Sequence, residues 1–215
     1  MTHIAPLADA RVRAYRWLAG LFARELTARE IGGYRAVQGQ ALLMDLARST
    51  PALAGGVEAL RAALRAETPD TELALDLAGD YARLFLGVAR RQAAPPFASA
   101  YLSERGLLFQ EATRRMENVL RYHDLSIPDD FKEPADHIAV ELTVMAELAG
   151  RGAVTDNPAA RRLRAEQADF LDIHLLTWLP DFARDCAQFD SRGVYGALAT
   201  ATHDFITDDR TRLAA

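Results

Sequence analysis

The sequence predicts an all-α fold, in which helices pack into a bundle, and three observations support this. Ala, Leu, Arg and Glu are abundant, and these residues lose little conformational freedom in a helix. Apolar residues recur at helical spacing, as Tyr15, Leu18, Leu21 and Phe22 do near the N-terminus. Alternating runs rich in Val, Ile and Thr, which would indicate strands, are almost absent.

The first half of the chain is expected to form helices separated by short turns. The first helix covers about residues 8–26. Thr27 and Glu30 then have the spacing of a capping box that opens another helical stretch, which Gly32 and Gly33 are expected to interrupt. Turns that contain Pro51 and Pro69 separate the next three helices, at about residues 34–47, 54–66 and 71–86.

Two breaks divide the second half of the chain. Residues 87–97 contain adjacent prolines, which exclude a continuous helix, and helix resumes over about residues 107–122. The second break, at residues 123–134, is the expected hinge. Helices then follow at about 134–150 and 158–179, with one or two shorter ones that end near 206. We therefore expect two subdomains joined by a hinge, with boundaries at 1–125, 126–134 and 135–215.

Composition excludes several classes of protein. The chain of 215 residues has a net charge of −5 and a pI near 5.6, which disfavours a nucleic-acid binder and suits a cationic partner. A single cysteine, Cys186, excludes an internal disulfide and a zinc ribbon. Asp9 and Arg11 interrupt the apolar run that a signal peptide needs, and no segment is apolar enough to span a membrane. We expect a cytoplasmic protein with no cofactor.

The segment from Glu133 to Glu141 is the most informative candidate site. Pro134 fits the first position of a helix, and Asp136 then falls in its first turn, where a carboxylate opposes the helix dipole. Glu133, His137 and Glu141 are spaced to share one edge of that helix. Spacing alone favours a capped, surface-facing helix start over a metal site, because the Glu-x-x-His motifs of di-iron bundles are missing.

Two further segments carry aromatic side chains at helical spacing. Tyr81, Leu84 and Phe85 share a helical face, and the loop with Pro96 and Phe97 could fold against it to form an apolar cleft. Such a stripe is more often core than binding surface. The second segment puts Phe170, Leu171, His174 and Trp178 on one face, which favours a core histidine over a general base. We find no motif that indicates a catalytic residue.

In order and spacing, four motifs together resemble the TorD family of redox-enzyme maturation chaperones, which includes DmsD-type and NarJ-like proteins. The resemblance covers roughly residues 77–205. Its strongest part is the box Glu133-Pro134-x-Asp136-His137-x-x-x-Glu141. The other three motifs are Asp80-Tyr81-x-Arg83-Leu84-Phe85-x-Gly87, Pro95-Pro96-Phe97-x-Ser99-x-Tyr101-Leu102 and His174-Leu175-x-x-Trp178-x-Pro180-x-Phe182.

This resemblance implies a non-catalytic chaperone in the cytoplasm. Such a chaperone binds the twin-arginine leader of a molybdenum-cofactor enzyme and holds the apo enzyme until the cofactor is loaded. The implied fold is a TorD-like bundle of two subdomains. The expected oligomeric state is a monomer that can form a domain-swapped dimer. The residues that match the family's leader-binding positions, or extend their anionic edge, are Tyr81, Leu84, Phe85, Pro96, Phe97, Asp136, His137 and Glu141. Positions 81 and 97 are often Trp in the DmsD-type branch but are Tyr81 and Phe97 here. The resemblance therefore does not identify the client enzyme.

Two alternatives from other classes stay open at this point. A helical metalloenzyme could use His137, Glu141 and His174 as ligands, although we expect no metal. A non-catalytic adaptor bundle would have the same helical pattern but no leader-binding cleft.

Overall fold

The computed structural model of the protein describes residues 6–88, 92–103, 106–151 and 158–214. These residues form eleven α-helices, a short 3-10 helix and a π-helical turn, and contain no β-strand. The prediction of an all-α protein is therefore confirmed. Residues 89–91 of the predicted break at 87–97 lie outside the described residues.

The helices of the first half are α1 (Pro6–Ala23), α2 (Ala28–Arg35), α3 (Val37–Ser49), α4 (Ala54–Leu64) and α5 (Asp70–Phe85), with the 3-10 helix η1 at Pro51–Leu53. Those of the second half are α6 (Ala98–Leu102), α7 (Glu111–Tyr122), α8 (Ile138–Gly150), α9 (Pro158–Phe170), α10 (Leu179–Phe189) and α11 (Val194–Leu213), with the π-helical turn η2 at Leu171–Leu175.

The predicted capping box is present at the start of α2. The Thr27 side chain accepts a hydrogen bond from the Glu30 backbone, and the Glu30 carboxylate accepts one from the Thr27 backbone. The predicted interruption at Gly32 and Gly33 is wrong, because α2 continues to Arg35. A glycine in a helix costs only about 1 kcal/mol relative to alanine. The Arg35 side chain donates to the carbonyls of Leu64, at the end of α4, and Thr68 and to the carboxylate of Asp70, at the start of α5, and these bonds help to offset that cost.

Four predicted helix bounds in the second half are also wrong. The last helix was expected to be short and to end near 206, whereas α11 has 20 residues and ends at Leu213. Helix α7 begins at Glu111 rather than near 107, and the short α6 lies just after the predicted break at 87–97, where no helix was expected. Helix α8 begins at Ile138 rather than Pro134, because residues 134–137 are held by hydrogen bonds to the segment before α6. The helix expected over 158–179 ends earlier, in the π-helical turn and a further turn before α10, which has Pro180 in its first turn.

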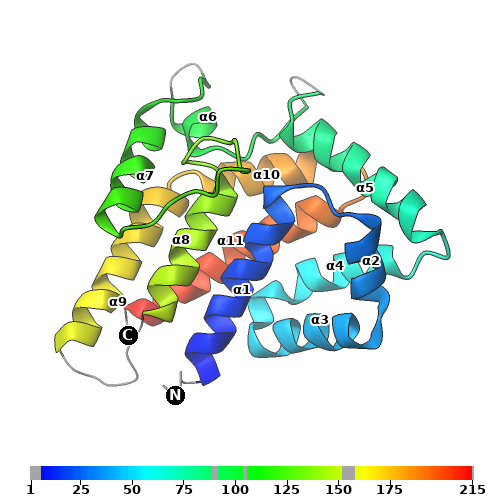
Figure 1. Cartoon of the computed structure of the whole chain (residues 1–215), viewed down its shortest axis with the longest axis horizontal. Coiled ribbons are helices and arrows are strands. Elements are labelled where there is room, and N and C mark those ends of the chain that lie inside the picture. The colour runs from blue at the N-terminus through cyan, green and yellow to red at the C-terminus, as the bar shows by residue number, and fades with distance from the viewer. Residues whose placement is uncertain (1–5, 89–91, 104–105, 152–157, 215) are drawn as a thin grey trace.

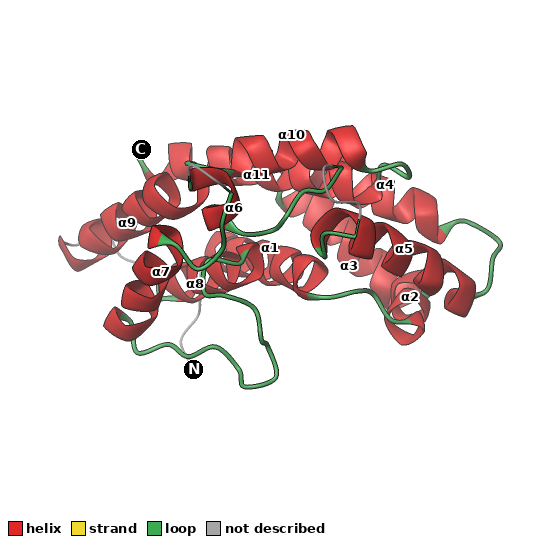
Figure 2. Cartoon of the chain, turned by 90° about the horizontal axis from the view of Figure 1, so that it is seen from above, coloured by secondary structure: helices red, strands yellow, loops and turns green. Residues whose placement is uncertain are grey.

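Helices α1 and α8 lie side by side at the centre of the molecule and run in opposite directions (Figure 1). Helix α11 packs behind them and contacts α10 and α4, so the C-terminal helix lies against the N-terminal half of the chain (Figures 1 and 2). One continuous hydrophobic cluster contains residues from both halves. The residues of the expected hinge at 126–134 are not helical, but the subdomain boundaries and the hinge remain predictions.

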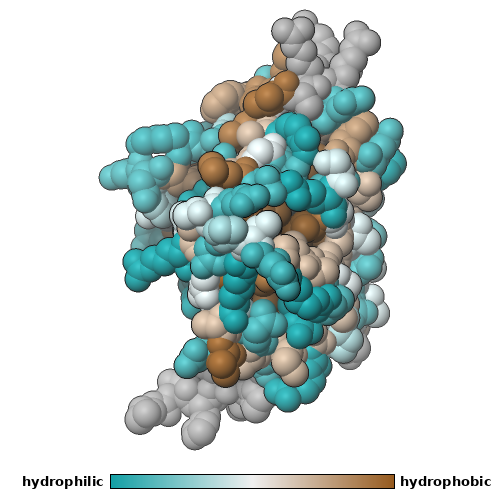
Figure 3. All heavy atoms as spheres, turned by 90° about the vertical axis from the view of Figure 1, so that its right-hand side faces the viewer, coloured by the Kyte–Doolittle hydropathy of each residue, from teal (hydrophilic) through white to brown (hydrophobic). Residues whose placement is uncertain are grey.

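The surface shows no broad hydrophobic band on the face drawn in Figure 3. Hydrophobic side chains appear there as separate brown spots among hydrophilic ones. Within the described part of the chain, none of the helices has the length and apolarity needed to cross a membrane.

Candidate functional site

The structure brings two of the sequence motifs into direct contact at the start of α8. Phe97 and His137 form an isolated antiparallel β-bridge. The Ala98 backbone N–H donates to the Asp136 carbonyl (3.0 Å), and the Ile138 N–H donates to the Pro96 carbonyl (2.9 Å). The proline-containing loop and the Asp-His box therefore form one unit, which holds the N-terminus of α8.

Asp136 lies at the centre of this unit and is fully buried. Its carboxylate accepts hydrogen bonds from the Ser99 backbone N–H (2.8 Å) and the Thr113 hydroxyl (2.7 Å). The prediction that it occupies the first turn of α8 is wrong, because that helix begins two residues later. Asp136 instead joins α6, α7 and the start of α8, and satisfies an N–H at the N-terminal end of α6.

His137 is the N-cap residue of α8, and its Nδ1 accepts a hydrogen bond from the Ala139 backbone N–H (3.0 Å). The imidazole lies between the rings of Phe97 and Phe131, with centroids 5.0 and 5.3 Å away. Burial in this apolar surrounding lowers the pKa of His137 to about 4. A neutral imidazole therefore caps the helix and supports the Phe131 ring.

Glu141 lies in the protein core with 1% of its surface exposed, not on an anionic edge with Glu133 and His137. The predicted shared edge is therefore wrong. The Glu141 carboxyl accepts a hydrogen bond from the Trp178 indole (3.1 Å), and the Tyr101 ring stacks on that indole. Burial raises the pKa of Glu141 well above its usual value.

The aromatic stripe on α5 also faces the core. Tyr81, Leu84 and Phe85 are each less than 5% exposed, and the Tyr81 hydroxyl donates to the Phe22 carbonyl (2.8 Å). Phe97 and Pro96 are buried as well. The structure thus brings all the predicted leader-binding residues into the interior rather than onto an open cleft. Their direct contact with a leader stays a prediction, and it would require the bundle to open.

The alternative metal site is not formed. Across the described residues, no group of three or more His, Cys, Asp or Glu side chains is arranged to hold a metal ion. His174 lies in the π-helical turn, where its ring stacks on that of Phe170 (4.8 Å). Partial burial and the nearby charge of Arg115 lower the pKa of His174 to about 4.

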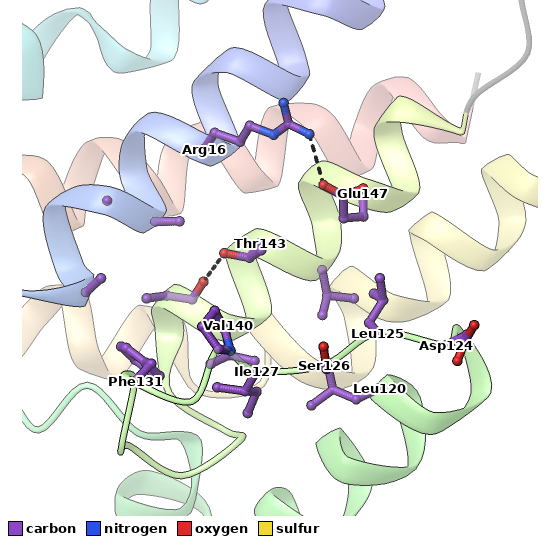
Figure 4. A pocket seen from close by; sticks show the side chains of 16 residues that line it. Arg16, Leu120, Asp124, Leu125, Ser126, Ile127, Phe131, Val140, Thr143 and Glu147 are labelled. Carbon is purple, nitrogen blue, oxygen red and sulfur yellow. Dashed lines mark hydrogen bonds and ion pairs between the residues drawn. The ribbon is translucent and has the colours of Figure 1, made fainter.

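An open groove lies on another side of α8, between that helix, α1 and the loop that follows α7 (Figure 4). Its volume is about 560 Å³, within the range typical of ligand pockets. The groove is lined mainly by apolar side chains. Its lining residues are Arg16, Ala19, Gly20, Ala23, Leu120, Asp124, Leu125, Ser126, Ile127, Pro128, Phe131, Ala139, Val140, Thr143, Val144 and Glu147.

Local structure explains why the groove is open. Small residues of α1, namely Ala19, Gly20 and Ala23, leave space beside α8. On the opposite wall, the Leu125 N–H donates to the Leu120 carbonyl (2.9 Å), which together with the left-handed conformation of Asp124 (φ 55°) makes a Schellman turn at the end of α7. This turn directs the chain away from α7 and along the groove.

Charged side chains lie at the rim of the groove. Arg16 of α1 and Glu147 of α8 form an ion pair of 2.9 Å, and Asp124 lies on the wall formed by the loop (Figure 4). Residues 123–134 carry four carboxylates and a single lysine. Of these carboxylates, only Asp124 lines the groove. The groove therefore combines an apolar floor with two carboxylates at its rim, Asp124 and Glu147, which suits a ligand that joins an apolar segment to cationic groups.

Sequence reasoning missed this groove, because none of its lining residues stands at a specified position of a motif. The one available signal was the spacing of Arg16, Gly20 and Ala23, which places a small-residue strip next to a charge on one side of α1. That signal is weak without knowledge of which helix packs beside α1.

Comparisons with known proteins agree with the fold. A family model described as "Nitrate reductase delta subunit" matches residues 50–184. The "Chaperone protein TorD" of Vibrio cholerae serotype O1 (strain O395) is 35% identical over 211 residues, which cover 98% of this chain and 94% of that protein. The protein of the same name from Psychrobacter sp. (strain PRwf-1) is 35% identical over 209 residues, covering 95% and 91%. That from Vibrio atlanticus (strain LGP32) is 34% identical over 210 residues, covering 96% and 95%.

Proposed function

The chain belongs to the TorD family of redox-enzyme maturation chaperones, and we propose that it binds the twin-arginine leader of a molybdenum-cofactor oxidoreductase. In this proposal the chaperone acts in the cytoplasm, where it holds the apo enzyme until its cofactor is inserted and export follows. The family's members are chaperones rather than enzymes, so the task is recognition and no catalytic residue is needed.

The observation that carries the proposal is the groove between α1, α8 and the loop after α7. A twin-arginine leader joins two adjacent arginines to an apolar segment. The apolar floor over Gly20 and Val140 fits the apolar segment, as in helix-in-groove recognition. Carboxylates at the rim, Asp124 and Glu147, fit the arginines.

The sequence motifs then act by supporting the groove. His137 caps α8, whose first turn supplies Ala139 and Val140 to the groove floor. The His137 ring also packs against Phe131, which lines the groove. Asp136 fixes the same backbone from beneath. In this proposal His137 and Asp136 are positioning residues.

A substitution that fills the groove tests the proposal. Gly20 is an exposed helical glycine, and a Cβ added there meets no atom within 4 Å. We expect Gly20→Leu to fold normally, because leucine favours helix more than glycine does. Its side chain should occupy the groove and weaken binding of a synthetic twin-arginine leader at least about tenfold, as the loss of a central binding contact does. Calorimetric titration of the full chain measures this.

The matched control is Gly55→Leu in α4. Gly55 is also an exposed helical glycine whose Cβ would meet nothing within 4 Å, but it lies outside the groove. We expect this variant to bind the leader as the wild type does. Equal affinity of both variants would contradict the groove as the binding site. A folded wild-type chain that binds no leader would favour the adaptor alternative instead.

A further inference from the structure

Arg16 and Glu147 both line the groove and form an ion pair. A leader arginine bound to a carboxylate of the groove would make the same kind of contact. Arg16 projects from α1, and its Nη2 donates to Glu147 Oε1 of α8 at 2.9 Å (Figure 4). Both side chains remain solvent-accessible, at 62% and 40% exposure. Because these residues lie on separate helices, the pair bridges α1 and α8 beside the groove and is not an ion pair within one helix.

We propose that Glu147 is the carboxylate that receives an arginine guanidinium of the leader, and that Arg16 occupies it in the free chain as a built-in competitor. This inference rests on the proposed function, which it deepens. The guanidinium of Arg16 offers Glu147 the same donors that an arginine of the leader would offer. An ion pair this exposed contributes little to stability, so an incoming arginine can replace it.

A second cationic side chain close in sequence to Glu147, that of Arg151, is engaged elsewhere. Arg151 is the C-cap residue of α8, one turn beyond Glu147, and its guanidinium donates to the His123 carbonyl (3.1 Å) while contacting the His123 ring. Arg16 is therefore the side chain that the structure pairs with Glu147.

The position of the pair also agrees with the polarity of the groove. Since α1 and α8 run in opposite directions, moving from Arg16 to Ala23 corresponds to moving from Glu147 toward Val140. An arginine bound at Glu147 would leave the following apolar segment free to extend past Gly20 toward Val140 and Phe131. The cationic and apolar parts of a leader thus meet matching surfaces in the order in which they are joined.

Competition predicts opposite effects for the two members of the pair. We expect Arg16→Gln to tighten leader binding about threefold, because the competitor is removed, and Glu147→Gln to weaken it about fivefold, both within the range of exposed ion pairs. The double variant should bind within about twofold of Glu147→Gln alone, since without the carboxylate there is nothing to compete for. Titration calorimetry of the full chain with the leader peptide measures all three.

A second peptide and a second ion pair serve as controls. A leader in which both arginines are replaced by glutamine should bind wild type and Arg16→Gln equally, within about twofold. Arg212 and Asp208 on α11 form a comparably exposed pair of 3.1 Å outside the groove, so Arg212→Gln should leave leader binding unchanged.

The outcomes separate this inference from the proposed function. If wild type binds the leader and Arg16→Gln binds it no more tightly, or more weakly, the competition is overturned. The groove then still stands as a binding site. A gain in Arg16→Gln that persists in the Glu147→Gln background also overturns it, because the gain would then reflect net charge alone. If wild type binds no leader, the proposed function fails and this inference fails with it.

Discussion

Helix α8 separates two regions with opposite properties. On one side, Asp136, His137 and Glu141 are buried and hydrogen-bonded to neighbouring segments. On another side, Val140 and Glu147 line an open groove. The first region contains specified residues of the recognisable motif, and the second contains only residues at its unspecified positions, such as Val140.

The difference follows from what each region demands of its residues. A buried polar group must find a partner with correct geometry, so only a few residue types satisfy each position. A groove needs small or apolar side chains and a charged rim, and many residue types supply these. A motif in this chain therefore identifies the support of a site more readily than the surface that contacts the ligand. The two regions are expected to respond differently to substitution.

The largest effect on stability is expected for Asp136→Ala. This change leaves the Ser99 N–H and the Thr113 hydroxyl without their acceptor in the core. Each unsatisfied buried group costs about 1–3 kcal/mol, so we expect the free energy of unfolding to fall by about 2–6 kcal/mol. Denaturant unfolding followed by circular dichroism measures this change. A loss below about 1 kcal/mol would contradict the central position given to Asp136.

Asp136→Asn is the matched variant. Its amide oxygen can accept from Ser99 and its amide group can donate to the Thr113 hydroxyl, so most of the stability should remain. If Asp136 supports the groove from beneath, the folded variant should bind the leader within about twofold of wild type, because the hydrogen-bonded geometry is kept. A large loss of affinity without unfolding would instead favour direct contact between Asp136 and the leader arginines, and would break the comparison.

Acid should destabilise the protein through His137. Its pKa is about 4 in the folded protein and near 6.5 when unfolded, so the unfolded state binds the proton first as pH falls. The stabilisation is fully present above pH 6.5 and should decline by about 3 kcal/mol as pH falls to 4. His137→Asn keeps a good N-cap and removes the titration, so its unfolding free energy should depend less on pH. Parallel curves for the two proteins over pH 4–7 would refute this.

Glu141 should give the opposite pH dependence. Its pKa is raised by burial, so its contribution to stability is present below the ordinary pKa of about 4.5 and is lost as pH rises. Glu141→Gln retains an acceptor for the Trp178 indole. We expect the unfolding free energies of variant and wild type to agree within about 1 kcal/mol below pH 4.5, and the variant to gain an advantage as the pH rises above that value. Glu147→Gln on the exposed side of α8 should change stability by less than about 1 kcal/mol.

Much of the fold follows from local sequence, and the errors have identifiable causes. The capping box at Thr27 and Glu30 depends on contacts within four residues, and it was predicted correctly. The start of α8 was misplaced because Pro134 fits a helix start locally, whereas backbone bonds to Pro96 and Ala98, some forty residues away, hold the segment extended. The continuation of α2 through Gly32 likewise depends on Arg35, which reaches a distant loop.

The site was harder to predict than the fold. Periodicity identified Tyr81 and Phe85 as a stripe on one helical face, but period alone does not say whether that face meets the core or a ligand. The groove arises where α1 packs beside α8, two helices more than a hundred residues apart. Only the packed structure shows that Gly20 and Val140 share one surface.

The smallest expected effect concerns Phe131, the residue that belongs to both regions. Its ring packs on His137 and also lines the groove. Phe131→Leu keeps an apolar wall but loses the aromatic contact, so we expect a loss of stability of about 0.5–1 kcal/mol. In a His137→Asn background the same change should cost less, since the contact is already absent, and a double-mutant cycle of unfolding free energies measures this coupling. Leader affinity should change less than about threefold in the folded variant, because the wall remains apolar. Additive stability losses would mean that the Asp-His unit and the groove are independent, and the supporting role of His137 would then be wrong.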